Sequence, residues 1–234
     1  MTRRGALVLA ATLVFALLTA RLGVWQLDRA AQKVELQAAV DAELDRPALG
    51  NAQLGEAGLH RRVVLRGHWV AERTVWLDNR PMDGRAGFHV VTPLRLAGRG
   101  DAVLVQRGWA PRDPVDRSRL PALTTPGGEV EVVGRIAATP SRLYELGAGS
   151  PGAIRQNLDP VAFAAESGLP LLPLTVVQTA DGASDGLLRH WPAPDLGLHK
   201  HYGYAFQWFA LCALILILYV WFQLVRPRLR RQQP

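Results

Sequence analysis

The stretch that decides the fold lies near the C-terminus and reads His199-Lys200-His201-Tyr202-Gly203-Tyr204-Ala205-Phe206-Gln207-Trp208-Phe209. No charged residue occurs between positions 203 and 225. At about 1.5 Å per helical residue, a run of this length covers the ~30 Å hydrocarbon core of a bilayer. The sequence therefore predicts a transmembrane helix over residues 203–225, with histidines at its mouth.

The basic tail of residues 226–234 gives this helix an orientation. By the positive-inside rule, its arginines place that end in the cytoplasm. They are Arg226, Arg228, Arg230 and Arg231. We therefore expect His201 at the opposite, non-cytoplasmic face of the membrane.

A second apolar run covers residues 5–27 and follows Arg3 and Arg4. A cleaved signal peptide is the alternative reading, because its apolar region would be of suitable length, but Leu18 stands where cleavage needs a small residue. Read as a span, the run makes Arg21 a snorkelling side chain and Trp25 part of an interfacial aromatic belt. Two spans then put both termini in the cytoplasm.

The net charge of +7 comes from arginines at the chain ends and in the first apolar run, so the central residues are neutral overall. A nucleic-acid-binding protein would need a clustered basic face on the folded domain, so we expect no nucleic-acid partner. The single cysteine, Cys212, lies within the second span. A thiol-based copper chaperone, a thioredoxin-like protein and a covalent c-type haem site each need further cysteines and are excluded.

The central residues 28–200 predict an α+β domain. Residues 28–44 lack proline and glycine and carry apolar residues at helical spacing, so we expect a helix that continues the first span. Short β-branched or aromatic runs separated by turn clusters follow at 63–70, 74–77, 88–91, 102–105 and 129–135. This spacing leaves no room for helical crossovers and favours an antiparallel sheet.

Two further elements are expected before the second span. Asp159 followed by Pro160 is typical of a helix N-cap with proline at the first helical position. Residues 172–178 form a further strand candidate. The fold class is thus α+β, with an antiparallel β-rich domain between two transmembrane helices.

Most short motifs in the domain carry no chemistry. Residues 147–152 match G-x-G-x-x-G, but Pro151 interrupts the loop and no helix is expected after it, which argues against a dinucleotide site. No hydrolase, zincin or P-loop motif occurs, so enzymatic activity has no visible carrier. We therefore expect a non-enzymatic protein.

Histidines and arginines of the domain are open to two readings. His60, His68 and His89 lie at or within strands without regular ligand spacing, which favours solvated or hydrogen-bonded residues over a metal site. Three arginines at turns or strand ends form surface ion pairs or bind an acidic partner or a propionate-like group. They are Arg80, Arg107 and Arg117.

The second span carries a stripe of His201, Tyr204, Trp208 and Cys212 at helical spacing. Gln207 lies on a neighbouring stripe and needs a hydrogen-bond partner on the first span or on another protein. His201 is either an interfacial residue or an axial ligand to a haem iron, with the aromatic stripe against the macrocycle. His199 points away from that face, because i and i+2 lie roughly 200° apart on a helix.

Several motifs resemble, in order, those of the surfeit-locus-one family, membrane proteins that assist assembly of haem-copper cytochrome c oxidase. Gly23-Val24-Trp25-Gln26-Leu27-Asp28-Arg29 with Lys33 resembles its opening motif, and residues 201–209 resemble its closing H-x-x-Y-A-x-x-W-F. Its central motifs are similar to Gly67-His68-Trp69, Leu77-Asp78-Asn79-Arg80, residues 87–94 and residues 105–109.

The resemblance implies a bacterial assembly factor that promotes haem a insertion into oxidase subunit I. His201 matches the histidine that bacterial members are proposed to use for haem a, so it is the candidate metal ligand, with Tyr204 and Trp208 as further haem contacts. The implied partners are subunit I, the machinery that makes or delivers haem a, and membrane lipids. The implied location is the bacterial inner membrane, with the domain in the periplasm. The alternative is a membrane scaffold that stabilises the nascent oxidase subunit without binding haem.

Overall fold

The computed structural model describes residues 3–56, 58–140, 152–180, 185–191 and 197–231. The chain forms two compact units, residues 1–39 with 194–234, and residues 40–193. Residues 147–151, most of the G-x-G-x-x-G match, lie outside the described residues.

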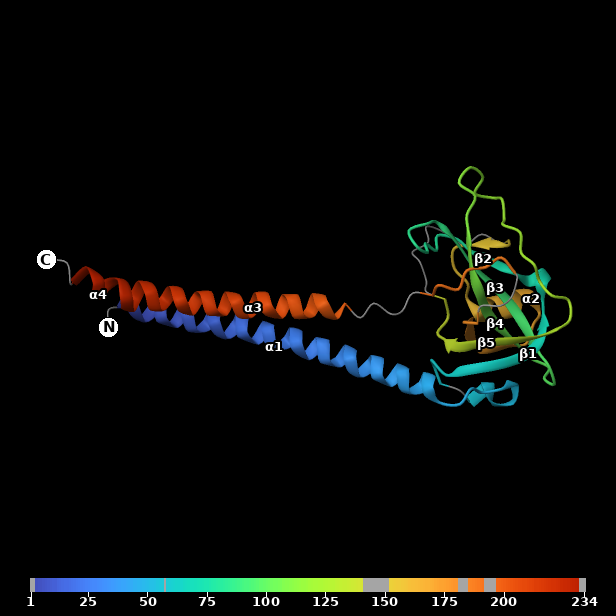
Figure 1. The fold of residues 1–234 in the computed structure, drawn as a ribbon, viewed down its shortest axis with the longest axis horizontal. Helices are drawn as coiled ribbons and strands as arrows, with labels where there is room; N and C mark the ends of the chain where they lie inside the picture. The colour runs from blue at the N-terminus through green and yellow to red at the C-terminus, as the bar shows by residue number, and fades with distance from the viewer. Residues whose placement is uncertain (1–2, 57, 141–151, 181–184, 192–196, 232–234) are drawn as a thin grey trace. The chain divides into compact units, whose positions relative to one another are not determined.

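The first unit is built by two long helices. Helix α1 runs over Arg3–Asp45, so the expected continuation of the first apolar run as a helix is confirmed. Helix α3 runs over Leu198–Tyr219 and continues through a turn of π-helix, η3 (Val220–Val225), into α4 (Arg226–Arg231). Both helices are long and apolar enough to cross a membrane. They lie side by side and antiparallel (Figure 1).

Burial along the two helices follows one spacing. On α1 the most buried residues are Ala16, Thr19, Gly23 and Ala30. On α3 Ala205 is buried, and the half-buried positions continue from it at alternating steps of three and four residues: His201, Trp208, Cys212, Ile215 and Tyr219. Alternation of three and four is the spacing of left-handed coiled-coil packing. Small side chains on α1 let the two backbones approach closely. We call this contact line the helix seam.

The second unit is a β domain whose described residues form a seven-stranded sheet. Its strands are β1 (Arg62–Trp69), β2 (Val75–Leu77), β3 (Gly87–Leu96), β4 (Ala102–Pro111), β5 (Glu129–Ala137), β6 (Ile154–Arg155) and β7 (Leu171–Gln178). The short helices η2 (Ala71–Arg73) and α2 (Pro160–Ser167) lie between strands, and η1 (Asn51–Glu56) precedes β1.

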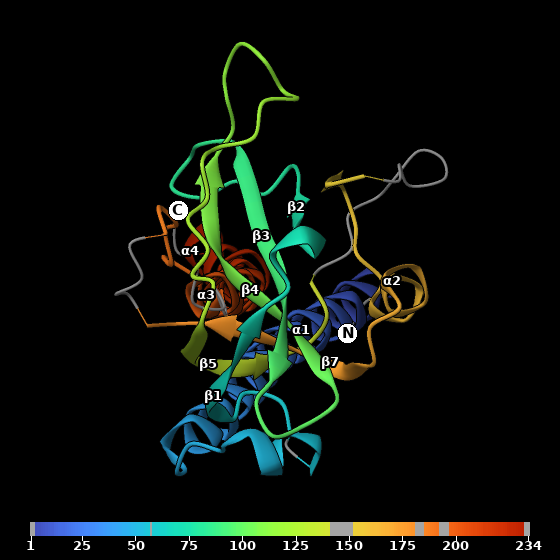
Figure 2. The same cartoon turned by 90° about the vertical axis from the view of Figure 1, so that its right-hand side faces the viewer.

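The sheet closes on itself. Within the described residues its order is β1-β5-β7-β4-β3-β2-β6, and β1 also pairs with β3. Strands β1, β5, β7, β4 and β3 therefore form a closed ring, and β2 and β6 extend the sheet beyond β3. Figure 2 labels the ring strands. Closure leaves these five strands without a long free edge.

Two strand pairings differ from the all-antiparallel expectation. Strand β4 pairs with β7 in parallel, and β2 pairs with β6 in parallel. Short connections favour antiparallel pairing between consecutive strands, but they do not determine how strands distant in the sequence pair. The chain between β4 and β7 contains β5, β6 and α2, which is enough length to return β7 alongside β4 in the same direction.

The barrel interior explains the period-two pattern of the strands. One face of each ring strand supplies buried aliphatic side chains, including Val63, Leu94, Val105, Val132 and Val176.

The short helix α2 also begins as the sequence predicts. The Asp159 carboxylate accepts hydrogen bonds from the backbone N–H groups of Val161 and Ala162 at 3.0 and 3.1 Å.

Candidate functional site

His201 lies in the first turn of α3 and faces α1. Helix α3 begins after Gly197, which adopts the left-handed conformation with φ of 57°. The Nδ1 atom of His201 lies 2.7 Å from the side-chain oxygen of Gln26 on α1. This oxygen can only accept, so the hydrogen bond places the imidazole proton on Nδ1. In the neutral imidazole the other nitrogen, Nε2, is then an acceptor, and no hydrogen bond reaches it from the described residues.

Close packing continues along the helix seam. A Cβ atom at Gly23 would lie 2.7 Å from Cζ of Phe209, so only glycine fits there without displacing the ring. Deeper in the span, the thiol of Cys212 lies 3.3 Å from the backbone oxygen of Ala16. At the opposite end, the space beside Gly197 lies close to Nζ of Lys33, 3.9 Å from a Cβ placed there. Helix α1, near the N-terminus, and helix α3, near the C-terminus, are therefore in contact along their lengths.

The stripe expected on the second span is only partly reproduced. His201, Trp208 and Cys212 lie on the helix seam, whereas Tyr204 is 53% exposed and Ala205 takes the buried position beside it. His199 is exposed, as its spacing from His201 requires. The structure therefore brings Trp208 and His201 to one side of α3 and turns Tyr204 away from it. The assignment of these residues to haem stays a prediction.

The glutamine that bonds across the helix pair is not the one the sequence singled out. Gln207 is exposed and makes no hydrogen bond to any described residue. Its expected partner on the first span is absent, and Gln26 bonds to His201 instead. The available signal was a lone amide beside Trp25 in an otherwise apolar run. Deducing its partner required the antiparallel register, which helical spacing alone does not give.

The His201 imidazole is oriented in the way that metal-binding histidines commonly are. A histidine that binds a metal through one ring nitrogen usually donates a hydrogen bond from the other to an oxygen acceptor. This bond fixes the tautomer and the orientation of the ring. Gln26 supplies such an acceptor. Among the described residues, no three His, Cys, Asp or Glu side chains gather into a metal site. His201 is therefore held as a single nitrogen donor, and its assignment to haem stays a prediction.

Histidines of the β domain play a different part. His89 on β3 is half-buried and its ring meets Trp191 edge-on, with 5.1 Å between ring centroids. Burial, together with the nearby charge of Arg80, lowers the pKa of His89 to about 4. His68 is exposed. Among the described residues, neither histidine belongs to a group of three or more His, Cys, Asp or Glu side chains that could hold a metal ion.

The arginines of the domain do not share one environment. Arg117 is exposed, but Arg80 and Arg107 are buried, with relative exposures of 5% and 1%. The expectation of surface ion pairs is therefore wrong for Arg80 and Arg107. Arg107 instead lies within 3.4 Å of the buried carboxylate of Asp185. Burial lowers the pKa of the Arg107 guanidinium, although Asp185 opposes this effect.

Comparison with known proteins gives a consistent result. The sequence model of the SURF1 family matches residues 13–213. The cytochrome oxidase assembly protein SHY1 of Saccharomyces cerevisiae is 30% identical over 115 residues, which are 46% of this chain and 30% of the yeast protein. Surfeit locus protein 1 of Mus musculus is 27% identical over 236 residues, covering 86% of this chain and 70% of the mouse protein.

A third relative aligns over nearly the whole chain. The SURF1-like protein of Monosiga brevicollis is 24% identical over 242 residues, with 94% of this chain and 88% of the relative covered. A SURF1-like protein of Rickettsia felis is 30% identical over 90 residues. The chain spans less than half the length of the yeast and Rickettsia felis relatives in these alignments.

The packing of Gly23 yields a testable prediction. Gly23→Val should push the Phe209 ring aside and weaken the helix pair by about 1–3 kcal/mol, as overpacked sites generally do. The measurement uses an Ala16→Cys background, in which a short bifunctional thiol reagent joins residue 16 to the native Cys212 in membranes. We expect the cross-linking yield to fall several-fold. Gly203→Val is the matched control, because nothing lies within 4 Å of a Cβ there. Equal yields in the two variants would contradict the packing.

The environment of His89 predicts a pH dependence. Its pKa is about 4 in the folded domain and about 6.5 in an unfolded chain. Between these values the unfolded state binds more protons, so the free energy of unfolding should fall as the pH drops, by at most about 1.4 kcal/mol per pH unit. Denaturant titrations of the full chain in detergent should show this slope, and His89→Gln should flatten it. His68→Gln, which changes an exposed histidine, should leave the slope unchanged. If His89→Gln kept a slope as steep as that of the wild type, His89 would not be the source of the pH dependence.

Proposed function

The chain belongs to the SURF1 family, and on this premise we propose that it is a membrane-bound, non-enzymatic assembly factor for haem-copper cytochrome c oxidase. The name of the yeast relative, a cytochrome oxidase assembly protein, supports the process. Two helices able to cross a membrane support the location. We place the protein in a bacterial inner membrane, with both termini in the cytoplasm and the β domain in the periplasm.

The more specific part of the proposal is that the protein promotes haem a insertion into oxidase subunit I by holding haem a transiently. The carrying observation is the hydrogen bond between Nδ1 of His201 and the Gln26 oxygen, which leaves the Nε2 lone pair available. His201 would hold haem a at this atom, and haem a would supply the redox-active iron that the oxidase requires. The partners are subunit I, the machinery that makes or delivers haem a, and the surrounding lipid.

The chain's own residues do three things in this scheme. Gln26 holds the imidazole in one tautomer and one orientation. Gly23 lets α1 and α3 approach closely enough for that bond to form. The half-buried Trp208, on the same side of α3 as His201, offers aromatic surface to an apolar macrocycle, whereas Tyr204 is exposed on the neighbouring face. A single protein ligand suits transfer, because release then requires breaking one coordinate bond.

The same hydrogen bond also favours a second candidate function. A polar bond between two membrane helices stabilises their association even without a ligand, by roughly 0.6–2 kcal/mol. In this reading His201 is part of a helix clamp, and the protein is a scaffold that stabilises the nascent oxidase subunit without binding haem.

One set of variants separates the two functions. The protein is purified from cells that make haem a, and haem content is read from the Soret band. Under the haem-holding proposal His201→Ala should lose the band, and Gln26→Leu should weaken haem retention by about 10–100-fold, the usual cost of removing an orienting partner. His199→Ala is the matched control, because His199 is an exposed neighbour on the same helix, and it should keep the band.

The outcomes discriminate clearly. Unchanged haem content in His201→Ala would remove the haem role from this residue. If that variant instead keeps its haem content but fails to restore oxidase activity in a deletion strain, the result supports the scaffold function. Normal oxidase activity in the deletion strain itself would contradict both functions.

A further inference from the structure

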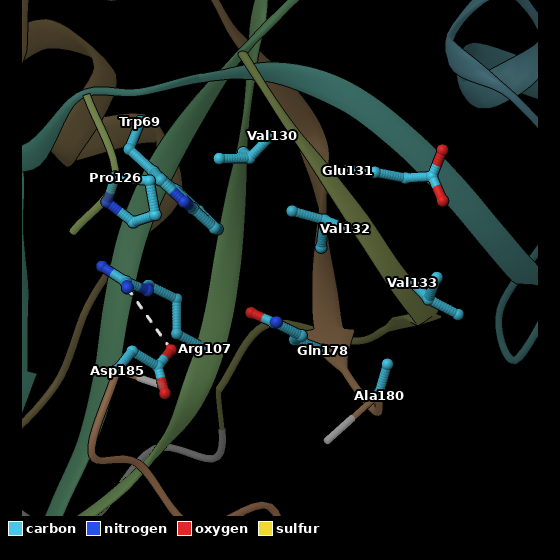
Figure 3. Close-up of a pocket in the computed structure, with 10 residues that line it drawn as sticks. All are labelled: Trp69, Arg107, Pro126, Val130, Glu131, Val132, Val133, Gln178, Ala180 and Asp185. Carbon is cyan, nitrogen blue, oxygen red and sulfur yellow. Dashed lines mark hydrogen bonds and ion pairs between the residues drawn. The ribbon is translucent and has the colours of Figure 1, made fainter. Parts of the chain in front are cut away.

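A cavity of about 320 Å³ lies at one mouth of the β barrel and is independent of the helix pair (Figure 3). Residues from four of the ring strands line it: Trp69 on β1, Arg107 on β4, Val130 and Val132 on β5, and Gln178 on β7. These residues continue the inward-facing pattern of the barrel interior. The cavity is thus the barrel core opening to its end, a common place for small ligands.

Most of the cavity wall is apolar. Val130, Val132 and Pro126 line it together with the ring of Trp69. The guanidinium carbon of Arg107 lies 4.7 Å from the centroid of that ring, so the cation is stacked on the aromatic face. Figure 3 shows Trp69, Arg107 and Gln178 turned toward one another around the cavity. A ligand here would find a largely apolar surface, with Arg107, Asp185 and Gln178 on one side. Glu131 also lines the cavity, away from these groups, and is paired with Arg66 at 3.0 Å.

The polar side of the cavity carries an unbalanced buried charge. Asp185 accepts from Arg107 at 3.4 Å and from Arg189 at 2.6 Å, and all three side chains are at most 2% exposed. Within the part of the chain that the structure describes, these two guanidinium groups and one carboxylate leave one excess positive charge. A buried charge without a counter-ion costs several kcal/mol, so this cluster favours a monovalent anion beside it.

Two buried polar atoms at this cavity have no hydrogen-bond partner among the described residues: Nε of Arg107 and the side-chain oxygen of Gln178. Both residues are more than nine-tenths buried, at 1% and 6% relative exposure. The other donors of Arg107 already bond, at 2.7 Å to the Thr125 hydroxyl and at 3.0 Å to the Thr124 carbonyl. A half-turn of the Gln178 amide would present its N–H group to the same space.

We propose that this cavity binds an organic carboxylate with an apolar body, one carboxylate oxygen accepting from Arg107 Nε and the other from the Gln178 amide. The apolar body lies on Val130, Val132 and Trp69. A carboxylate matches the single excess charge and the two available donors. A phosphate would bring up to two charges and more acceptor oxygens than the cavity can satisfy. This site requires no haem and does not depend on the proposed function of His201.

The carboxylate can come from a free small acid or from the C-terminus of a polypeptide with an apolar last residue. The two sources share the same recognition chemistry, and two pairs of probes distinguish them. The first pair is isovalerate and its uncharged amide, isovaleramide. The second pair is a short peptide ending in leucine, with a free or an amidated C-terminus. Binding to the full chain in detergent is measured by isothermal titration calorimetry.

Variants locate binding in the cavity. Gln178→Glu places a carboxylate where the ligand would sit, so it should weaken the charged probe by roughly tenfold or more, the value of a charge-assisted hydrogen bond. It should also keep the domain folded, because the new carboxylate lies beside Arg107. Gln53→Glu is the matched control on an exposed position outside the cavity, and it should bind as wild type does. Circular dichroism and the denaturation midpoint confirm that both variants are folded.

Each result has a defined meaning. A charged probe that binds at least tenfold more tightly than its amide, and that Gln178→Glu weakens, supports the proposal. Tighter binding of the peptide then assigns a polypeptide C-terminus, and tighter binding of isovalerate assigns a free acid. Binding of neither charged probe, equal binding of acid and amide, or unchanged binding by Gln178→Glu would overturn it.

Discussion

The hydrogen bond between His201 and Gln26 depends on one constraint, the close approach of α1 and α3 along the helix seam. Small residues at Ala16, Thr19 and Gly23 remove the side-chain bulk that would hold the helices apart. In lipid, apolar side chains gain little by packing on each other rather than on acyl chains, so this shape match and the polar bond hold the pair together. The same bond decides which imidazole nitrogen is available for chemistry.

The β domain follows a different physical rule. Closure of the five ring strands buries an aliphatic interior and removes the exposed edges that an open sheet would present. At one mouth, aliphatic packing gives way to the buried residues Arg107, Asp185 and Arg189, whose charges sum to one positive charge among the described residues. A protein selected for stability alone gains little from such a cluster, since apolar side chains of similar size usually serve as well. In the proposed carboxylate site, this cluster supplies the positive charge that the ligand neutralises.

Local signals in the sequence were sufficient for many elements and insufficient for their partners. The N-cap at Asp159, the strand periods and the two apolar helices follow from adjacent residues, and the structure has them. The parallel pairing of β4 with β7 joins segments separated by three other elements, so no local pattern reports it. Spacing and resemblance identify His201, but its hydrogen bond joins it to Gln26, 175 positions away in the sequence. The sequence around Arg107 predicts a surface residue, and only the closed barrel shows that its side chain is buried.

The central claim is that Gln26 fixes His201 as the Nδ1–H tautomer, with Nε2 available. Solid-state NMR of the full chain in lipid bilayers, with ¹⁵N-labelled histidine and a His201→Ala sample to assign the signal, reports the protonated nitrogen directly. The account predicts that His201 shows a protonated Nδ1 and an unprotonated Nε2, and that Gln26→Leu abolishes this preference. A proton on Nε2 in the wild-type protein, or the same tautomer in Gln26→Leu, would contradict it.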